Sequence, residues 1–244
     1  MYDIIGDIHG CAYELHLLLE KLGYEQAKLG MVYNPPKGRK AVFLGDLIDR
    51  GRASGVVFCT VRNMVRADFA LLARGNHDDK LMRWAKGNNV VLNHGLDKTV
   101  EEIKLFTSKQ EVYNFLRNMP MYHLLDEGKL IAVHGAWHSG LKDKDPFDKK
   151  CRSWCLYAPT TGKTLPNGLP DRIDWVIDRK ETEPIIVYGH QPYREPRILN
   201  GTYGIDTGCV FGGHLTSLRY PEMEIVQVKA HRVYDDSKPD IGQK

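Results

Sequence analysis

The stretch 45–51, GDLIDRG, combines two carboxylates, Asp46 and Asp49, with the guanidinium group of Arg50. It directly follows the apolar run 40–44, which predicts a buried strand. Carboxylates bind divalent cations, and a planar guanidinium group binds phosphate oxygens. In open α/β sheets, ligands bind at the carboxyl ends of the strands, where this stretch would lie. The alternative is an ordinary turn, because Asp and Gly both favour turns.

The same arrangement recurs after four other apolar runs, which weakens the turn alternative. Each run is followed by a residue type that binds metal ions and that stands next to glycine. These residues are Asp7 and His9 after Tyr2–Ile5, Asn76 and His77 after 69–73, His134 after Leu130–Val133, and His190 after Ile185–Tyr188. One such coincidence is ordinary, whereas five in one chain indicate a shared site.

Asp, His and Asn side chains together select divalent metals of intermediate character, such as Mn, Fe, Zn, Co or Ni. Two ions about 3.5–4 Å apart need a shared carboxylate between them. We therefore expect two divalent ions, with manganese as the preferred metal. The expected ligands are Asp7 and His9 for one ion, Asn76, His134 and His190 for the other, and Asp46 as the bridge.

Strands and helices that would carry these residues alternate in the first third of the chain. Apolar spacing predicts helices at 11–22, at 54–65 with Ser54 as the N-cap, and at 80–86. The proline-containing segment 30–39 is expected to be a surface loop. This order predicts an α/β fold whose first sheet is largely parallel.

The later part of the chain predicts more helices and a second sheet. Two amphipathic helices are expected within 97–118, and a hairpin within 121–133 turns at Glu127-Gly128. Five short strands, at Ile185–Tyr188, Arg197–Leu199, 202–205, 215–219 and 224–228, suggest a second, more antiparallel sheet. We expect one domain over 1–234, with 136–184 as a substrate-selecting insertion and 235–244 as a frayed tail.

Length and composition bound the class of protein. The 244 residues suffice for one large domain, and the net charge of +3 argues against a dedicated nucleic-acid binder. No stretch approaches the ~20 apolar residues of a membrane span. The five cysteines are an odd number without CxxC spacing, which fits reduced thiols and a cytoplasmic protein.

The motifs, taken in order, resemble those of a known family. They are GDIHG at 6–10, GDLIDRG at 45–51, GNHD at 75–78, HG at 134–135 and GH at 189–190. The set is similar to the calcineurin-like metallophosphoesterases, in particular their phosphoprotein-phosphatase branch. This resemblance implies two facing mixed β-sheets flanked by helices, with the active site at the sheet edges. Asp78 departs from the Glu that the family often carries there, and we expect little consequence because it is not an expected ligand.

Three downstream stretches, 94–96, 157–168 and 205–213, narrow the resemblance. They look like bacterial bis(5'-nucleosyl)-tetraphosphatases of the PrpE/ApaH type, and like the phosphatase domain of bacterial polynucleotide kinase-phosphatases. The leading expectation is therefore hydrolysis of a small dinucleoside polyphosphate. The alternatives are a phosphoprotein phosphatase or general phosphomonoesterase, an RNA-end 2',3'-phosphodiesterase-phosphatase, and a catalytically silent binding module.

A mechanism follows from these residue types. A hydroxide that bridges the two metal ions would attack phosphorus in line, while Arg50 grips the non-bridging oxygens. His77 is the expected general acid, with Asp49 accepting its other ring N–H; the resemblance implies the same pair. Arg74 is a second phosphate candidate, for which a structural salt bridge is the alternative.

Two further residues are candidate substrate contacts. Arg152 lies in a basic and aromatic segment that also holds Trp154 and Arg172, and aromatic rings there could stack on a base. Of the arginines in this segment, Arg152 is the expected phosphate contact. The alternative is a solvated loop pinned by buried aromatics. Asp206 is expected to orient His190 or to contact substrate, with a turn carboxylate as the alternative.

Overall fold

Short strands and helices alternate along the chain. The computed structural model describes residues 1–28, 31–166, 168, 170–180 and 184–237. The strands are β1 (Tyr2–Ile5), β2 (Glu25–Gln26), β3 (Tyr33–Asn34), β4 (Lys40–Phe43), β5 (Ala70–Leu72), β6 (Tyr122–Leu125), β7 (Leu130–Val133), β8 (Thr160–Thr164), β9 (Pro170–Arg172), β10 (Ile185–Tyr188), β11 (Arg197–Leu199), β12 (Thr202–Gly204), β13 (His214–Tyr220) and β14 (Glu224–Lys229). The helices are α1 (Ala12–Lys21), α2 (Ser54–Arg66), α3 (Asn76–Lys86), α4 (Leu96–Phe106), α5 (Lys109–Arg117) and α6 (Arg152–Tyr157), with the 3-10 turns η1 (Asp126–Gly128), η2 (Ser139–Leu141), η3 (Lys149–Cys151) and η4 (Cys209–Phe211).

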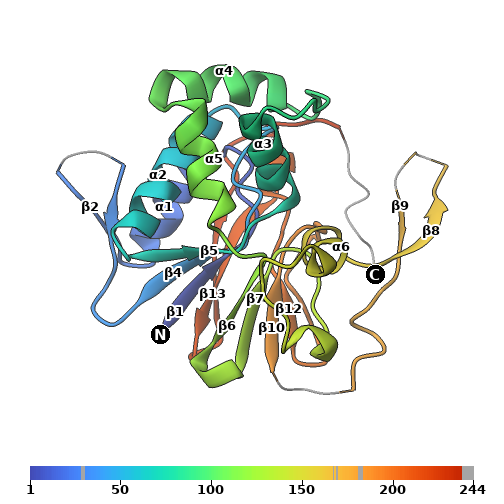
Figure 1. Cartoon of the computed structure of the whole chain (residues 1–244). Coiled ribbons are helices and arrows are strands. Elements are labelled where there is room, and N and C mark those ends of the chain that lie inside the picture. The colour runs from blue at the N-terminus through green and yellow to red at the C-terminus, as the bar shows by residue number, and fades with distance from the viewer. Residues whose placement is uncertain (29–30, 167, 169, 181–183, 238–244) are drawn as a thin grey trace.

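Two five-stranded sheets form the centre of the fold, in the orders β14-β13-β1-β4-β5 and β11-β12-β10-β7-β6 (Figure 1). Both sheets are mixed. In the first, β1, β4 and β5 run parallel, β13 pairs antiparallel with β1, and β14 pairs antiparallel with β13. In the second, β7, β10 and β12 run parallel and β6 and β11 are antiparallel. The α/β architecture of two mixed sheets flanked by helices is confirmed.

Alternate residues of the central strands enter different cores, as the two-residue period of a strand requires. On β4, Val42 packs between the two sheets, whereas Phe43 packs under the helices. On β10, Val187 packs between the sheets, whereas Ile186 and Tyr188 face the outer side of the second sheet. The sequences of these central strands are therefore continuous apolar runs, because both faces of each strand are buried.

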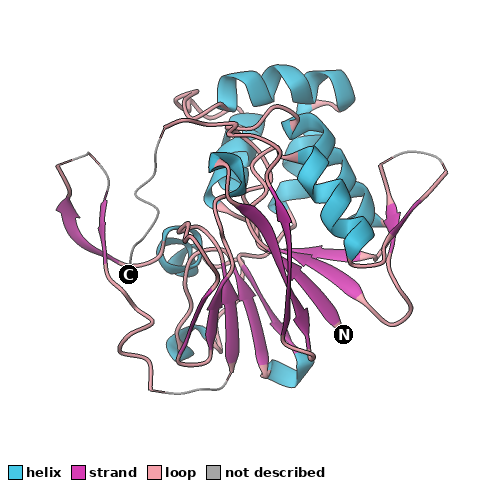
Figure 2. Cartoon of the chain, turned by 180° about the vertical axis from the view of Figure 1, so that it is seen from behind, coloured by secondary structure: helices cyan, strands magenta, loops and turns pink. Residues whose placement is uncertain are grey.

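Helices cover the outer faces of the sheets unequally. The five helices α1 to α5 gather on the side of the first sheet, where Leu15, Leu18 and Leu19 of α1 enter the largest core (Figure 1). The outer face of the second sheet is covered by α6 and by loops, with Leu156 and Trp137 in its core. The view from behind shows the hairpin of β8 and β9 projecting from this side (Figure 2).

The predicted division of strands between the sheets is wrong at the C-terminal end. β13 and β14 join the first sheet instead of the second, and β13 pairs with β1 so that Ile4 lies opposite Leu218. Both side chains are fully buried between the sheets. Apolar alternation predicts these strands, but it does not say which sheet edge they complete, because that edge is formed by residues about 200 positions earlier in the sequence.

Local predictions were corrected at two helix starts. α3 begins at Asn76 rather than near residue 80, so Asn76 and His77 form its first turn instead of a loop. The N-cap of α2 is Ala53 and not Ser54. The hydroxyl of Ser54 instead accepts the backbone N–H of Asp49 at 3.0 Å, a use that sequence spacing does not reveal.

Two segments expected to be irregular contain ordered contacts. Within the predicted loop 30–39, Tyr33 belongs to β3 and is 1% exposed; residues 29–30 lie outside the described residues. In the predicted frayed tail, Asp235 donates its backbone N–H to the carbonyl of Val210 at 3.0 Å. Residues 238–244 lie outside the described part of the chain. The break predicted between the helices of 97–118 is confirmed, with Ser108 capping α5.

Among the helices of the described residues, none combines the length and the apolar character needed to cross a bilayer.

Candidate metal centre

Five strand ends bring the predicted metal ligands to one edge of the two sheets. β1, β4 and β5 are parallel neighbours, so the residues that follow them meet at the same edge. β7 and β10 are likewise parallel, and they supply His134 and His190 from the second sheet. The site is therefore built between the carboxyl ends of two sheets.

The backbone at these strand ends is strained. His9, Asp46, Asp49, Arg50 and His190 all have φ between +46° and +73°. Residues with side chains rarely adopt this left-handed region, and such strain gathers at functional sites. The concentration of five such residues at one sheet edge marks the edge as the functional one.

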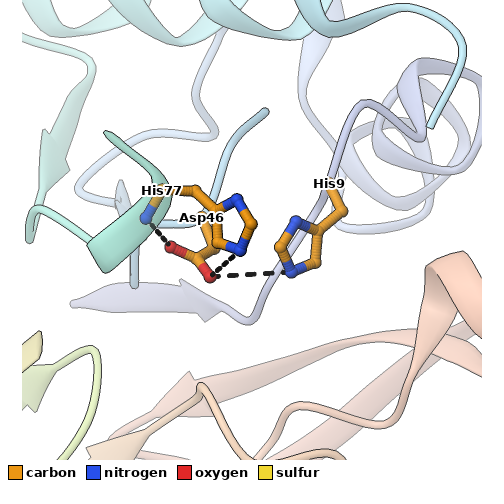
Figure 3. A group of neighbouring side chains, drawn as sticks. All are labelled: His9, Asp46 and His77. Atoms are coloured by element: carbon orange, nitrogen blue, oxygen red, sulfur yellow. Dashed lines mark hydrogen bonds and ion pairs between the residues drawn. The ribbon is translucent and has the colours of Figure 1, made fainter. Parts of the chain in front are cut away.

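A first cluster consists of His9, Asp46 and His77, whose ligand-type atoms lie within 4.8 Å of one another (Figure 3). Asp46 Oδ2 lies 3.6 Å from His9 Nε2 and 3.9 Å from His77 Nε2. The backbone N–H of His77, in the first turn of α3, donates to Asp46 Oδ1 at 2.9 Å. The partial positive charge of that helix end favours the carboxylate.

A second cluster consists of Asp46, His134 and His190. His134 Nε2 lies 3.5 Å from Asp46 Oδ1, 3.0 Å from Asn76 Oδ1 and 3.1 Å from His190 Nδ1. The three residues predicted for the second ion are thus brought together. Asp46 belongs to both clusters, with one oxygen towards each, which is the geometry of a bridging ligand.

The histidine rings are held so that a free nitrogen faces the site. Nδ1 of His9 donates to the carbonyl of Ile48, and Nδ1 of His134 donates to the carbonyl of Leu44, each at 2.9 Å. Each donation leaves Nε2 as the unprotonated nitrogen, which is the form that binds metal. His190 Nε2 is buried and has no hydrogen-bond partner among the described residues.

Burial keeps these rings neutral. It lowers the pKa of His9 to about 3, against the opposing charge of Asp46. Burial also lowers the pKa of His134 and, together with the neighbouring His134 ring, lowers the pKa of His190 well below its usual value. Neutral imidazoles beside buried carboxylates fit divalent cations, and the donor set suits the metals predicted from the sequence.

Asp7 lies beside the second cluster, with its Oδ1 3.9 Å from His134 Nδ1. Its two oxygens accept the backbone N–H of His190 at 3.2 and 3.1 Å. Gly189 permits this approach, because a Cβ there would stand 2.1 Å from Asp7 Oδ1. Burial and then the charges of Asp206 and Asp46 raise the pKa of Asp7 well above its usual value. A divalent cation bound here would offset the repulsion between these carboxylates. In the described structure Asp7 is not within the 4.8 Å cluster of His9, and His77 stands there instead.

The predicted pair of His77 and Asp49 is present. His77 Nδ1 donates to Asp49 Oδ2 at 2.6 Å. Burial lowers the pKa of His77, but the charge of Asp46 and the hydrogen bond to Asp49 outweigh it, and the pKa is raised. Thr99 donates its hydroxyl to Asp49 Oδ1 at 2.7 Å and fixes the carboxylate. Sequence reasoning missed Thr99, which stands 50 residues from Asp49 without any local motif.

Asp78 has a larger role than its sequence position indicated. Its carboxylate accepts the backbone N–H groups of Asp46 at 2.9 Å, Leu47 at 3.2 Å and Gly75 at 2.9 Å. It therefore ties the strand end of β4 to the start of α3 and positions the bridging carboxylate. Burial and the charge of Asp46 raise its pKa to about 7. The prediction that this position has little consequence misses this contact.

The arginines are distributed differently from the prediction. Arg50 Nη1 pairs with Asp235 Oδ2 at 2.6 Å, and its guanidinium group lies 5.4 Å from the ring centre of Phe211. Arg74 is 6% exposed, donates to the carbonyl of Leu116 at 3.2 Å, and pairs through Nε with Asp79 Oδ1 at 3.8 Å, which is the salt bridge named as its structural alternative. Arg50 was predicted to bind phosphate oxygens. In the described structure its guanidinium group is instead paired with Asp235 of the C-terminal segment.

Arg152 and Arg172 have different surroundings. Arg152 Nη2 pairs with Asp79 Oδ2 at 2.5 Å and lies 3.4 Å from the hydroxyl of Tyr157. Arg172 donates to the backbone carbonyl of Tyr157, and its charge lowers the pKa of both His134 and His190. The charge of Arg172 therefore acts on both rings of the second cluster.

In the described structure Asp206 does not orient His190, because the backbone N–H of His190 donates to Asp7. Its Oδ1 accepts the N–H of Gly208 at 3.0 Å, as a turn carboxylate does. Burial raises its pKa to about 7. Asp206 acts on the site through charge, since it raises the pKa of Asp7.

A separate buried group of metal-ligand types, Cys11, Glu14 and Cys209, lies near the C-terminal segment. The carboxylate of Glu14 already accepts the N–H of His231 and the hydroxyl of Tyr234, each at 2.8 Å. This group therefore anchors the chain that leads to Asp235. All five cysteines are free and buried.

The sequence of the chain is similar to those of known phosphoesterases. The family described as Calcineurin-like phosphoesterase matches residues 2–218. The chain is 44% identical over 240 residues to "Bis(5'-nucleosyl)-tetraphosphatase PrpE [asymmetrical]" of Anoxybacillus flavithermus, with 96% of each protein covered. It is 46% identical over 249 residues to the protein of the same name from Geobacillus thermodenitrificans, covering 99% of this chain and 97% of that one.

Solved structures share the fold. The crystal structure of a proposed diadenosine tetraphosphatase has a TM-score of 0.67 at 24% identity and covers 94% of this chain and 93% of its own. A protein serine/threonine phosphatase from Saccharomyces cerevisiae has a TM-score of 0.60 at 17% identity, covering 98% and 81%. With the family match over most of the chain, and with a histidine and carboxylate cluster at the sheet edges, the protein belongs to the calcineurin-like phosphoesterase family.

Proposed function

We propose that this chain hydrolyses dinucleoside polyphosphates, as an asymmetrically cleaving bis(5'-nucleosyl)-tetraphosphatase that depends on two divalent ions. The observation that carries the proposal is Asp46, which offers one carboxylate oxygen to each of two histidine clusters. The substrate class is supported by the full-length relatives, which are 44% and 46% identical and bear that enzyme name.

The proposed ligands are drawn from the two clusters and from Asp7, whose Oδ1 lies 3.9 Å from His134 Nδ1. Asn76, His134 and His190 hold one ion, Asp7 and His9 hold the other, and Asp46 is shared between them. Two cations bound there would neutralise the phosphate oxygens and activate water for in-line attack. We propose manganese as the metal. A cytoplasmic location is also proposed, and the five free thiols support it.

The remaining steps are carried out by side chains of the chain itself. Arg172 holds non-bridging phosphate oxygens from the side of the second cluster, and Arg50 holds them from the first cluster once its contact with Asp235 opens. His77 donates the proton of Nε2 to the leaving oxygen, because Nδ1 is committed to Asp49. Thr99 keeps that carboxylate in place through its hydroxyl.

A substrate panel tests the proposal. The purified chain with Mn²⁺ is given diadenosine tetraphosphate, p-nitrophenyl phosphate, a phosphopeptide and an RNA 2',3'-cyclic end, and kcat/KM is measured for each. The dinucleotide should rank first, with ATP and AMP as products. A phosphopeptide cleaved as fast as the dinucleotide would favour the protein-phosphatase alternative, and a faster RNA end would favour the repair-type alternative. Formation of two ADP molecules would contradict asymmetrical cleavage.

A further inference from the structure

A cavity of about 380 Å³ lies on the outer side of the second sheet, among α6, η2 and the segment that leads into β10. Its volume falls within the range of about 300–1,000 Å³ that is typical of small-molecule sites. Three of the four tryptophans of the chain, Trp137, Trp154 and Trp175, line it. Ile131 of β7 also lines it. The cavity is therefore walled by flat aromatic rings against an apolar strand.

One polar atom in this wall is unsatisfied. Trp137 is 3% exposed, and its indole N–H has no hydrogen-bond partner among the described residues. A buried indole N–H normally finds an acceptor, since leaving it unpaired costs free energy. Asp178 also lines the cavity and offers a carboxylate acceptor, and the exposed Lys142 offers a positive charge. A ligand that fits must be flat and must present both an acceptor and a donor.

An aminopurine has these features. Its ring nitrogens accept a hydrogen bond, its exocyclic amino group donates one, and both of its faces stack on aromatic side chains. The ring of His138 lies 4.4 Å from the ring of Trp154, and the ring of Trp175 lies 5.2 Å from that of Tyr188. These neighbours hold both tryptophans, so the stacking surfaces exist before a ligand arrives.

α6 joins this cavity to the metal centre. The N–H groups of Gly135 and Ala136, directly after His134, donate to the carbonyls of Cys155 and Trp154 at 2.6 and 3.0 Å. Gly135 permits this approach, because a Cβ there would stand 2.9 Å from the carbonyl oxygen of Trp154. Three residues further along α6, the ring of Tyr157 lies 6.4 Å from the ring of His190. Trp154 in the cavity wall and Tyr157 beside the second cluster are thus about one helical turn apart along α6.

We propose that this cavity binds the purine base of a nucleotide, and that it holds one nucleoside end of the dinucleotide while the phosphates reach the metal centre. The assignment of the base to a dinucleotide rests on the proposed function, whereas the base site itself does not. Trp154 and Trp175 provide the stacking faces, and Trp137 donates its N–H to a ring nitrogen.

Intrinsic fluorescence tests the site without turnover. Adenosine is titrated into the full chain in EDTA, with inorganic phosphate as the comparison probe. Adenosine should quench tryptophan emission saturably, and phosphate should not. Trp154→Ala and Trp137→Phe should each weaken adenosine binding at least tenfold, whereas Trp84→Phe, which changes the tryptophan outside the cavity, should not weaken it. Ser139→Tyr, which fills the cavity from an exposed position, should weaken binding without removing a core side chain.

Two results would contradict the proposal that the cavity binds a purine base. One is the absence of saturable quenching in the unaltered chain, and the other is unaltered binding by Ser139→Tyr and Trp154→Ala when both variants are folded. Dodecanoate, an aliphatic carboxylate, should not displace adenosine at a concentration below that of the adenosine itself. If it does, the assignment of the site to a purine is wrong.

Steady-state kinetics separate this site from the proposed function. With Mn²⁺, Trp154→Ala should raise KM for diadenosine tetraphosphate at least ten times more than KM for p-nitrophenyl phosphate. If adenosine binds as expected but the dinucleotide is not hydrolysed, the proposed function fails and the base site stands. If the dinucleotide is hydrolysed but adenosine does not bind in the cavity, the base site fails and the proposed function stands.

Discussion

The metal centre and the parts of the chain beyond residue 136 that surround it differ in how their functional groups are held. In the metal centre, backbone groups fix the side chains: His134 is held by the carbonyl of Leu44, and Asp78 binds three backbone N–H groups. Two arginines that contact the later segments or belong to them are held by ion pairs between side chains, Arg152 with Asp79 and Arg50 with Asp235. β8 is exposed along its whole length.

This difference separates reaction chemistry from substrate selection. Groups held by the sheet backbone cannot move without loss of the fold, so they suit chemistry that tolerates little displacement. Groups held by exposed or half-buried pairs can exchange one partner for another, so they suit contacts that form when substrate arrives. Substitutions in the two regions should therefore differ in size and in the kinetic constant affected.

The largest effect is expected for Asp46→Asn, which removes a charge from both clusters. The variant should lose roughly 1,000-fold or more in kcat, because the stabilisation supplied by bound cations is worth several kcal/mol. Metal content, measured by elemental analysis, should also fall. Asp68→Asn is the matched control, since this carboxylate is 83% exposed and pairs with Lys40 away from the site. Full activity in the Asp46 variant would refute the shared ligand.

His77→Ala should follow, with a loss that depends on the leaving group. General-acid catalysis contributes typically 10²–10⁴-fold, so the dinucleotide should slow by about that factor while p-nitrophenyl phosphate slows less. Metal content should stay at the level of the unaltered chain. A fall in metal content would instead assign His77 as a ligand of the first cluster, where its ring stands in the structure. Equal losses for both substrates would contradict proton donation.

Arg172→Ala and Arg152→Ala form a matched pair from the later segment. Arg172→Ala should lower kcat/KM by about 10–100-fold, because a hydrogen bond to a charged group is worth about 1.5–3 kcal/mol. Arg152→Ala should change it less, since Arg152 is committed to Asp79. The reverse order would restore the ranking expected from the sequence and would remove Arg172 from the phosphate site.

The smallest effect is expected for Asp235→Asn, which frees Arg50. The pair is largely but not fully buried, with side chains 19% and 17% exposed. Its loss should lower KM for the dinucleotide by up to about fivefold, because partly exposed pairs contribute about 0–1 kcal/mol. Asp236→Asn, at the neighbouring position, should leave KM unchanged. A higher KM in Asp235→Asn would show that Asp235 assists substrate binding instead of competing for Arg50.

Sequence reasoning could place the candidate ligands near one another because parallel strands impose a common edge. Each of Asp7, His9, Asp46, His134 and His190 lies within a few residues of the end of a short apolar run, and the carboxyl ends of parallel neighbours must meet. Local chemistry likewise predicted the break between the two helices of 97–118, where Ser108 caps α5. The break and the strand pattern depend on residue type and on periods of two or 3.6 residues, both of which can be read within a short window. The pair of His77 with Asp49, 28 positions apart, was expected from the residue types and the family resemblance instead.

Only the tertiary structure decided which partners meet across long separations. Asp78 reaches the N–H of Asp46 across 32 positions, Thr99 reaches Asp49 across 50, and Arg50 meets Asp235 across 185. The same holds for β13, which completes the sheet edge of β1, and for Trp137, whose N–H is left without a described partner. Residue types specify what a side chain can bind, but the packing of distant elements determines which of these contacts it makes.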